Sequence, residues 1–147
     1  MPGLPERLRA AMNEARKQRD QARTLLLSTI LADLKNTEIA LHHPASDDET
    51  ADVLRRGIKQ RREAAEQYAA AGRTELAERE LAEVGMLEAF LPAAADPEEI
   101  RRAVREAIAA GAKDVGKLMG RVMPTFKGRA DGKLVNQIAR EELAATV

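Results

Sequence analysis

Apolar side chains recur every three or four residues along most of this chain, and no segment alternates apolar and polar residues as a β-strand does. The segment 20–42 illustrates the pattern with one helical stripe formed by Leu27, Ile30, Leu31, Leu34 and Leu41. Ala, Leu, Glu and Arg are abundant, and these residues lose little side-chain freedom in a helix. The sequence therefore predicts an all-α fold.

Glycine, proline and capping residues mark the ends of seven expected helices. Ser46 and Glu49 form a capping-box pattern, in which each side chain accepts a hydrogen bond from the other residue's backbone amide. Gly72 suits a helix C-terminus, and Pro124 is expected to stop the sixth helix at Met123. The expected helices span about residues 4–18, 20–42, 46–71, 73–91, 97–110, 114–123 and 131–145. The fourth is expected to bury Ala77, Leu81, Val84, Leu87 and Leu91.

The segment Pro92-Ala-Ala-Ala-Asp96-Pro97 is the clearest break in the helical pattern. Its aspartate can cap the next helix, and its second proline suits the first helical position, where a missing amide hydrogen is harmless. We therefore expect two helical subdomains. An N-terminal helical bundle would occupy residues 1–92, and a small three-helix tail would occupy residues 93–147.

The side-chain inventory offers little for catalysis. The chain has no Cys, so it has no disulfide, thiolate metal site or thiol nucleophile. His42 and His43 stand together without a third ligand, and we expect no metal and no cofactor. The acidic pair Glu141-Glu142 fits an exposed helix surface and not acid–base catalysis. The chain shows no signal-peptide pattern and no apolar run near the roughly 18 residues of a membrane span, so we expect a cytoplasmic protein that does not bind a membrane.

Charge is distributed unevenly along the chain, although the net charge is +0. Residues 113–147 carry seven basic and four acidic side chains, so this part is basic. Lys117 and Arg121 are four residues apart and share one helix face, while Asp131 is placed to cap the last helix. A basic helix–loop–helix of this kind can hold phosphates by displacing their counterions. An ordinary solvated helix–loop–helix explains the same residues, and the sequence leaves both interpretations open.

The segment KGRADGK (127–133) matches a nucleotide-binding P-loop only in part. Gly128 and Gly132 are four residues apart instead of five, Leu134 replaces the required Ser or Thr, and no strand precedes the loop. We therefore exclude nucleotide hydrolysis.

The helix expected before this loop carries two glycines, Gly116 and Gly120, which cost roughly 1 kcal/mol each relative to Ala. This cost suggests that another backbone or a ligand approaches them closely, and we favour close packing against the fifth or seventh helix. The apolar residues of this helix are expected to form core and not an adaptable binding surface: Val115, Leu118, Met119, Val122, Met123 and Phe126.

Three segments resemble one known family. They are GKLMGRVMPTFKGRADGKLVNQIAREEL at 116–143, LLLSTILADLKNTEI at 25–39, and the helical run at 58–92. Together they resemble the GatB/YqeY family, and within it the stand-alone YqeY-like proteins. A similar module ends the B subunit of the tRNA-dependent amidotransferase, where this tail is associated with tRNA contact. The resemblance implies an all-helical, two-part protein whose partner is tRNA, or an amidotransferase or another aminoacyl-tRNA-related protein.

The resemblance also implies a set of binding residues and three alternative functions. Candidate RNA contacts are Lys117, Arg121, Lys127, Arg129 and Lys133, with Asn136 as a polar contact or a local cap partner. We favour a non-catalytic accessory module that binds tRNA through the basic tail. A protein-interaction module that docks on an amidotransferase or another complex is the alternative. Carbon–nitrogen ligase activity with glutamine as amido-N-donor is the third, although the chain lacks the amidotransferase's catalytic part and no catalytic residue is identifiable, so we do not expect an enzyme acting on its own.

Overall fold

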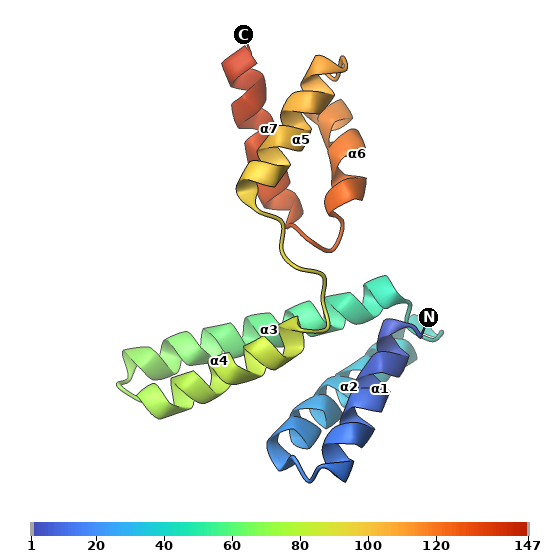
Figure 1. Ribbon diagram of the computed structural model, residues 1–147, viewed down its shortest axis with the longest axis vertical. Coiled ribbons are helices and arrows are strands. Elements are labelled where there is room, and N and C mark those ends of the chain that lie inside the picture. Colours follow the sequence, from blue (N-terminus) through green and yellow to red (C-terminus); the bar gives the residue numbers. More distant parts are fainter. Residues whose placement is uncertain (1, 147) are drawn as a thin grey trace. The chain divides into compact units, whose positions relative to one another are not determined.

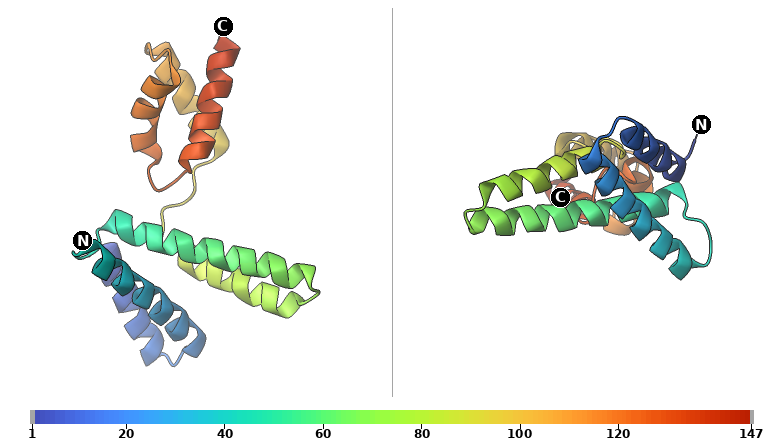
Figure 2. Two further views of the ribbon diagram at one scale, coloured as in Figure 1. Left: turned by 180° about the vertical axis from the view of Figure 1, so that it is seen from behind. Right: turned by 90° about the horizontal axis from the view of Figure 1, so that it is seen from below.

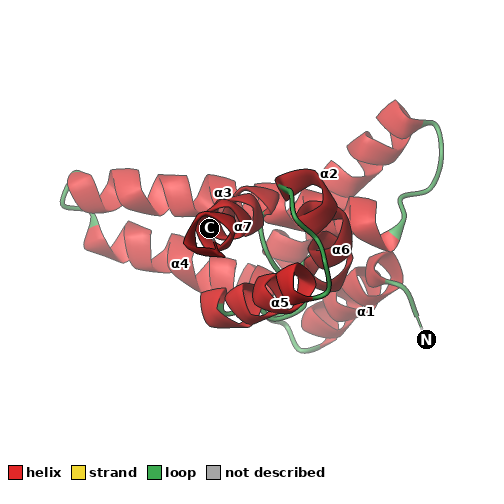
Figure 3. Ribbon diagram, turned by 90° about the horizontal axis from the view of Figure 1, so that it is seen from above, coloured by secondary structure: helices red, strands yellow, loops and turns green. Residues whose placement is uncertain are grey.

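The computed structural model describes residues 2–146, and over that range it consists of helices and loops without a strand (Figure 1, Figure 3). The all-α prediction is confirmed. The helices are α1 (Leu4–Lys17), α2 (Gln21–Leu41), α3 (Asp47–Ala70), α4 (Thr74–Glu88), α5 (Pro97–Ala109), α6 (Val115–Phe126) and α7 (Gly132–Thr146). The chain divides into two compact units, Met1–Leu91 and Pro92–Val147, which we call the N-terminal and C-terminal units.

The N-terminal unit contains two helical hairpins. α1 lies beside α2, and α3 runs antiparallel to α4, as expected from the short connection at Gly72 (Figures 1 and 2). α2 and α3 pack closely where Gly57 leaves room, because a Cβ atom at this position would lie 2.9 Å from Ile30 Cδ1. The core is aliphatic, and its most deeply buried members are Leu8, Leu27, Ile30, Leu34, Leu54 and Leu87.

Two leucines that we expected in this core are exposed instead. Leu41 is 36% exposed because it is the last residue of α2, directly before His42, whose positive φ of 62° turns the chain away. Leu81 is 53% exposed because it lies outside the stripe of α4 that faces α3 through Ala77, Val84 and Leu87. Helical spacing alone therefore predicted burial for two leucines that the structure leaves exposed.

The C-terminal unit packs α5, α6 and α7 around a separate core, and each helix contacts the other two (Figure 1). Its fully buried members include Ile100, Val104, Leu118, Phe126, Val135 and Ile138. α6 does not stop at Met123 as predicted but continues through Pro124 to Phe126. Proline there removes only one helical hydrogen bond, and the extra turn buries the Phe126 ring, which is 1% exposed. The free energy gained by burying this ring offsets the cost of a proline inside the helix.

An ion-pair cluster joins α5 to α7, and the sequence did not reveal it. Glu142 is 8% exposed and accepts hydrogen bonds from Arg101 Nη1 at 2.9 Å and Arg105 Nε at 3.0 Å. Arg101 also donates to Glu141 at 3.0 Å. The expectation that Glu141 and Glu142 form plain exposed surface is therefore wrong for Glu142. Hydrogen bonds from Arg105 and then Arg101 lower the pKa of Glu142 below its ordinary value of 4.5.

This lowered pKa makes the stability of the C-terminal unit depend on acid pH. The folded state holds Glu142 ionised more strongly than the unfolded chain does, so the stabilisation is complete above pH 4.5 and is lost as pH falls through the folded-state pKa. We expect Glu142→Gln to lower the Tm relative to wild type at about pH 7, and we expect this gap to narrow progressively as the pH falls below 4.5. Thermal unfolding followed by circular dichroism measures the gap. Glu106→Gln, on an exposed face of α5, is the control and should leave the Tm unchanged. A gap of constant size across this pH range would contradict the role of Glu142.

Candidate nucleic-acid interface

The exposed side of α6 carries two of the predicted cations. Lys117 has a side chain 72% exposed to solvent, with Nζ 4.0 Å from Asp114 Oδ2. Arg121 is also exposed, and its Nη1 lies 3.5 Å from the backbone carbonyl of Ala110. The first distance is at the upper limit for an ion pair and the second is at the upper limit for a hydrogen bond. Both contacts are therefore weak, and both side chains can turn toward a ligand.

The two acidic residues of the basic segment have structural roles. Asp114 Oδ1 accepts from the Lys117 amide at 2.8 Å and caps α6. Asp131 Oδ1 accepts from the Lys133 amide at 3.0 Å at the start of α7, as its position in the sequence predicted. Each carboxylate therefore stabilises first-turn amides, where negative charge is favourable. The lysines of this segment and Arg121 are exposed to solvent.

The loop between α6 and α7 places two further predicted cations at its ends. Lys127 follows α6 and is exposed, and Lys133 is exposed in the first turn of α7. Gly128 has a φ of 80°, which lets the chain reverse sharply after Phe126. The amides of Arg129 and Ala130 both donate to the Phe126 carbonyl, at 2.8 and 3.0 Å. The loop is thus closed by backbone hydrogen bonds.

Arg129 makes several contacts within the C-terminal unit. Its Nη2 forms an ion pair with Glu99 at 2.9 Å, and its Nε donates to the Ala93 carbonyl at 3.3 Å. The guanidinium also lies 5.8 Å from the centroid of the Phe126 ring. Its backbone carbonyl accepts from the Ala95 amide at 2.8 Å. Any contact of Arg129 with RNA has to coexist with this role in holding the segment before α5 against the α6–α7 loop.

Asn136 lies in α7 and is half-buried. Its Oδ1 accepts a hydrogen bond from Arg140 Nε at 2.8 Å, four residues further along the helix. This bond joins two residues within α7 and is not a helix cap, so the role of Asn136 as an RNA contact or a cap partner stays a prediction.

The length of α6 determines how far apart the exposed lysines of this surface lie. It has 12 residues and is about 18 Å long at 1.5 Å per residue. Lys113 and Lys117 lie toward its start, whereas Lys127 and Lys133 lie beyond its end. Phosphates along one strand of a nucleic-acid duplex are about 3.4 Å apart in projection on the axis, so this length corresponds to about five of them. The cations are spread over a length that suits an extended polyanion better than a single phosphate.

The two glycines of α6 are not explained by packing within the C-terminal unit. A Cβ atom at Gly120 would meet no atom within 4 Å, and one at Gly116 would meet only Asp114 Oδ1, at 3.3 Å. The prediction that α5 or α7 packs tightly against them is wrong, because both glycines lie on the exposed side of the helix. Gly120 instead lines a shallow apolar groove together with Met119, Met123, Pro124 and Lys127. The sequence reveals the residues of this groove but not that they stay uncovered within the unit.

The open space around Gly120 leads to a stability prediction. Gly120→Ala should stabilise the C-terminal unit by about 1 kcal/mol, because alanine restricts the unfolded chain and meets no steric obstacle here. Chemical denaturation of the two proteins measures the difference. Gly111→Ala is the matched control, since it also adds a methyl group in open space but at a φ of 107°. That variant should be destabilised. A destabilised Gly120→Ala protein would contradict the geometry described for α6.

The fold and this surface define an all-helical protein whose last three helices present a basic helix–loop–helix. Comparison with known families gives a match to the Yqey-like protein family over residues 5–143. The chain therefore belongs to the YqeY-like family. It is also similar to "Altered inheritance of mitochondria protein 41, mitochondrial" of Pyrenophora tritici-repentis (strain Pt-1C-BFP), with 26% identity over 145 residues that cover 95% of this chain and 80% of that protein.

The structure also bears on the expectations about membrane spans and about the two histidines. No helix between residues 2 and 146 is long and apolar enough to cross a membrane. His43 contacts its own surroundings, with Nδ1 2.8 Å from the Pro44 carbonyl and Nε2 3.7 Å from Glu49 Oε2. Within the described part of the chain, no three His, Asp or Glu side chains gather as metal ligands would. The cellular compartment stays a prediction.

Proposed function

We propose that this protein is a non-catalytic accessory module that binds tRNA through the basic surface of its C-terminal unit. The proposed contacts are made by Lys117, Arg121, Lys127 and Lys133, with Lys113 extending the surface beyond the start of α6. The observation that carries the proposal is that the acidic and basic residues of this surface have different roles. Asp114 and Asp131 cap helices, whereas the lysines around them are exposed.

The choice of tRNA over other polyanions rests on the family resemblance. The motif from Gly116 to Leu143 resembles the tail of the tRNA-dependent amidotransferase B subunit, which is associated with tRNA contact. We propose that the C-terminal unit is related to that tail and uses the same partner. Membership of the YqeY-like family is consistent with this relationship. The scarcity of aromatic residues, 2% of the chain, favours backbone contact over stacking on unpaired bases.

The proposal has a simple quantitative test. Fluorescence anisotropy with labelled tRNA should show binding at about 50 mM salt and a steep loss of affinity at about 200 mM. If the five cations named above each contact one phosphate, the slope of log K against log salt is expected to be about −4. Undetectable binding at low salt would remove the proposal.

Docking onto a protein is the second candidate, and the apolar groove beside Gly120 favours it. A partner helix could approach the α6 backbone closely at this position, because no side chain of the unit covers it. Under this alternative, Gly120→Leu abolishes capture of a purified amidotransferase, whereas the four-alanine variant at Lys117, Arg121, Lys127 and Lys133 still binds it. Under the tRNA proposal the four-alanine variant loses its ligand. The ligase alternative is separate, and an assay of glutamine-dependent amidation by the purified chain alone decides it.

A further inference from the structure

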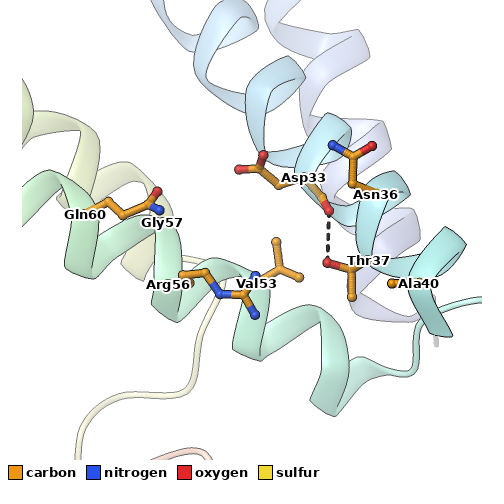
Figure 4. Close-up of a pocket in the computed structure, with 8 residues that line it drawn as sticks. All are labelled: Asp33, Asn36, Thr37, Ala40, Val53, Arg56, Gly57 and Gln60. Carbon is orange, nitrogen blue, oxygen red and sulfur yellow. Dashed lines mark hydrogen bonds between the residues drawn. The ribbon is translucent and has the colours of Figure 1, made fainter.

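A groove lies between α2 and α3 in the N-terminal unit, and the proposed tRNA surface includes none of its residues (Figure 4). Its volume is about 350 Å³, and the two helices contribute four lining residues each. Small-molecule sites in proteins typically have volumes of about 300–1,000 Å³. The groove is therefore large enough for a ligand of the size of an amino acid or a dipeptide.

The two charged residues of the groove have opposite signs and stand on opposite walls. Asp33 belongs to α2 and Arg56 belongs to α3 (Figure 4). In the part of the chain that the structure describes, neither side chain has an ion-pair or hydrogen-bond partner, and the two do not pair with each other. By contrast, Arg55, Arg61 and Arg62 on the same helix each form an ion pair at 2.9 Å. A ligand that carries one positive and one negative group matches both walls of the groove.

Three neutral polar side chains also line the groove. Asn36 and Gln60 are exposed carboxamides, each with donors and an acceptor, and neither has a side-chain hydrogen bond to another described residue. The Thr37 hydroxyl donates to the Asp33 carbonyl at 3.0 Å, so its oxygen is left as an acceptor. An apolar ligand would remove water from these groups without replacing its hydrogen bonds, which costs free energy. The lining therefore favours a polar ligand.

We propose that this groove binds a small zwitterion, either a free amino acid or a dipeptide. The ammonium group of the ligand pairs with Asp33, and its carboxylate pairs with Arg56. Val53 is buried and lines the groove, so it contacts the carbon atoms of the ligand. A phosphate or another anion would meet the Asp33 carboxylate, and a polyamine would meet the Arg56 guanidinium. Ligands with a single sign of charge are therefore disfavoured.

The exposure of the two charged side chains sets the expected affinity. Asp33 and Arg56 are both exposed, and ion pairs in contact with water contribute little free energy. A ligand of fewer than about ten heavy atoms also offers few contacts, so we expect a Kd of about 1 mM. Binding should weaken as the salt concentration rises, because salt screens both ion pairs.

NMR titrations of the isotope-labelled full chain with L-serine and with glycyl-L-serine test the proposal. The serine hydroxyl gives each ligand a group that can bond to the carboxamides. Amide signals of residues 33–40 and 53–60 should shift with a Kd of about 1 mM for at least one ligand, and the tighter of the two decides between a free amino acid and a dipeptide.

Two substitutions test the assigned contacts. Asp33→Asn and Arg56→Gln should each weaken binding of the tighter ligand by about fivefold or more, because each removes one charge-assisted contact. Glu78→Gln and Arg79→Gln are the matched controls, since they remove the same charges from an exposed part of α4. Both controls should bind like wild type. Amide spectra of the ligand-free variants should match wild type away from the substituted residues, because all four side chains are exposed.

Blocked forms of the tighter ligand identify which wall holds which end. The N-acetylated form lacks the ammonium group and the C-terminal amide lacks the carboxylate, so each should bind wild type at least about fivefold more weakly. Asp33→Asn should not weaken binding of the N-acetylated form further, and Arg56→Gln should not weaken binding of the amide further.

Each alternative result overturns the proposal. Absence of shifts with both ligands at about 20 mM excludes a zwitterion site of the expected affinity. Shifts confined to residues outside 33–40 and 53–60 exclude this groove. Wild-type affinity in Asp33→Asn or Arg56→Gln, or equal losses in the α4 controls, excludes the assigned contacts. Blocked ligands that bind as tightly as the free zwitterion exclude recognition of its charges. None of these measurements uses tRNA, so their failure leaves the tRNA proposal unaffected.

Discussion

Replacing Lys117, Arg121, Lys127 and Lys133 together with alanine is expected to weaken tRNA binding by about 10³–10⁴-fold at about 0.1 M salt. Counterion release makes each phosphate contact worth roughly eightfold at this salt concentration, so the loss of four contacts compounds. The salt dependence should flatten at the same time, because fewer counterions are released. Fluorescence anisotropy titrations at several salt concentrations measure both quantities. The four side chains are exposed, so the fold of the variant should be unchanged.

A second variant separates the proposed surface from the net charge of the protein. Arg9, Lys17, Lys59 and Arg73 are exposed cations of the N-terminal unit, and their replacement with alanine removes the same charge. This control should bind tRNA within about threefold of wild type. Equal losses in the two variants would show that overall charge determines binding, and wild-type affinity in the first variant would exclude the α6–α7 surface. Arg129→Ala is tested separately, since its contacts with Glu99 and Phe126 predict a loss of stability as well.

Phe126→Ala is expected to destabilise the C-terminal unit by about 3–5 kcal/mol, because it leaves a cavity where a fully buried ring lies between α6 and its neighbours. A small three-helix unit has little stability to spare, so this loss should unfold it. The N-terminal unit has its own core, with no residue in common with this one. It should therefore stay folded in the variant.

Amide correlation spectra by NMR can follow the two units separately. In Phe126→Ala, dispersed signals of residues 97–146 should collapse, while those of residues 4–91 remain at their wild-type positions. Leu81→Ala removes a side chain of comparable character that is 53% exposed, and it should change neither set. Simultaneous loss of all signals in Phe126→Ala would contradict independent cores.

Local sequence rules predicted the helices and most of their ends correctly. Ser46 and Glu49 form the expected capping box, and Asp96, Asp114 and Asp131 each accept from an amide in the first turn of the following helix. These successes share one physical basis. Capping depends on residues within three positions of one another, so the necessary information is local.

The errors arose where contacts between distant residues decide the outcome. Pro124 was expected to end α6, but burial of Phe126 carries the helix past it. Glu142 was expected at the surface, but Arg101 lies opposite it from a helix 41 residues away in sequence. Gly120 was expected beneath another helix and faces open space within its unit. In each case the local sequence pattern was interpreted correctly. The outcome depended on whether a residue distant in sequence packs nearby, and the sequence does not show this.

In the candidate site too, local sequence patterns predicted some features, whereas contacts between distant residues were missed. The sequence indicated the exposed residues Lys117, Arg121, Lys127 and Lys133 and the two capping aspartates. It did not show that Arg129 is bonded to Glu99 and to the carbonyl of Ala93, because these partners lie 30 and 36 residues earlier in the chain. Tertiary structure therefore shifts the proposed contacts toward Lys117, Arg121, Lys127 and Lys133.

The central claim is that tRNA binds the basic surface of the C-terminal unit, and an NMR titration of the isotope-labelled full chain with tRNA tests it most directly. The account predicts that amide signals of residues 113–133 shift or broaden first, that those of α1 and α2 remain in place at equal tRNA concentration, and that about 300 mM salt reverses the change. Perturbation confined to the N-terminal unit, or no perturbation at any salt concentration, would contradict the account.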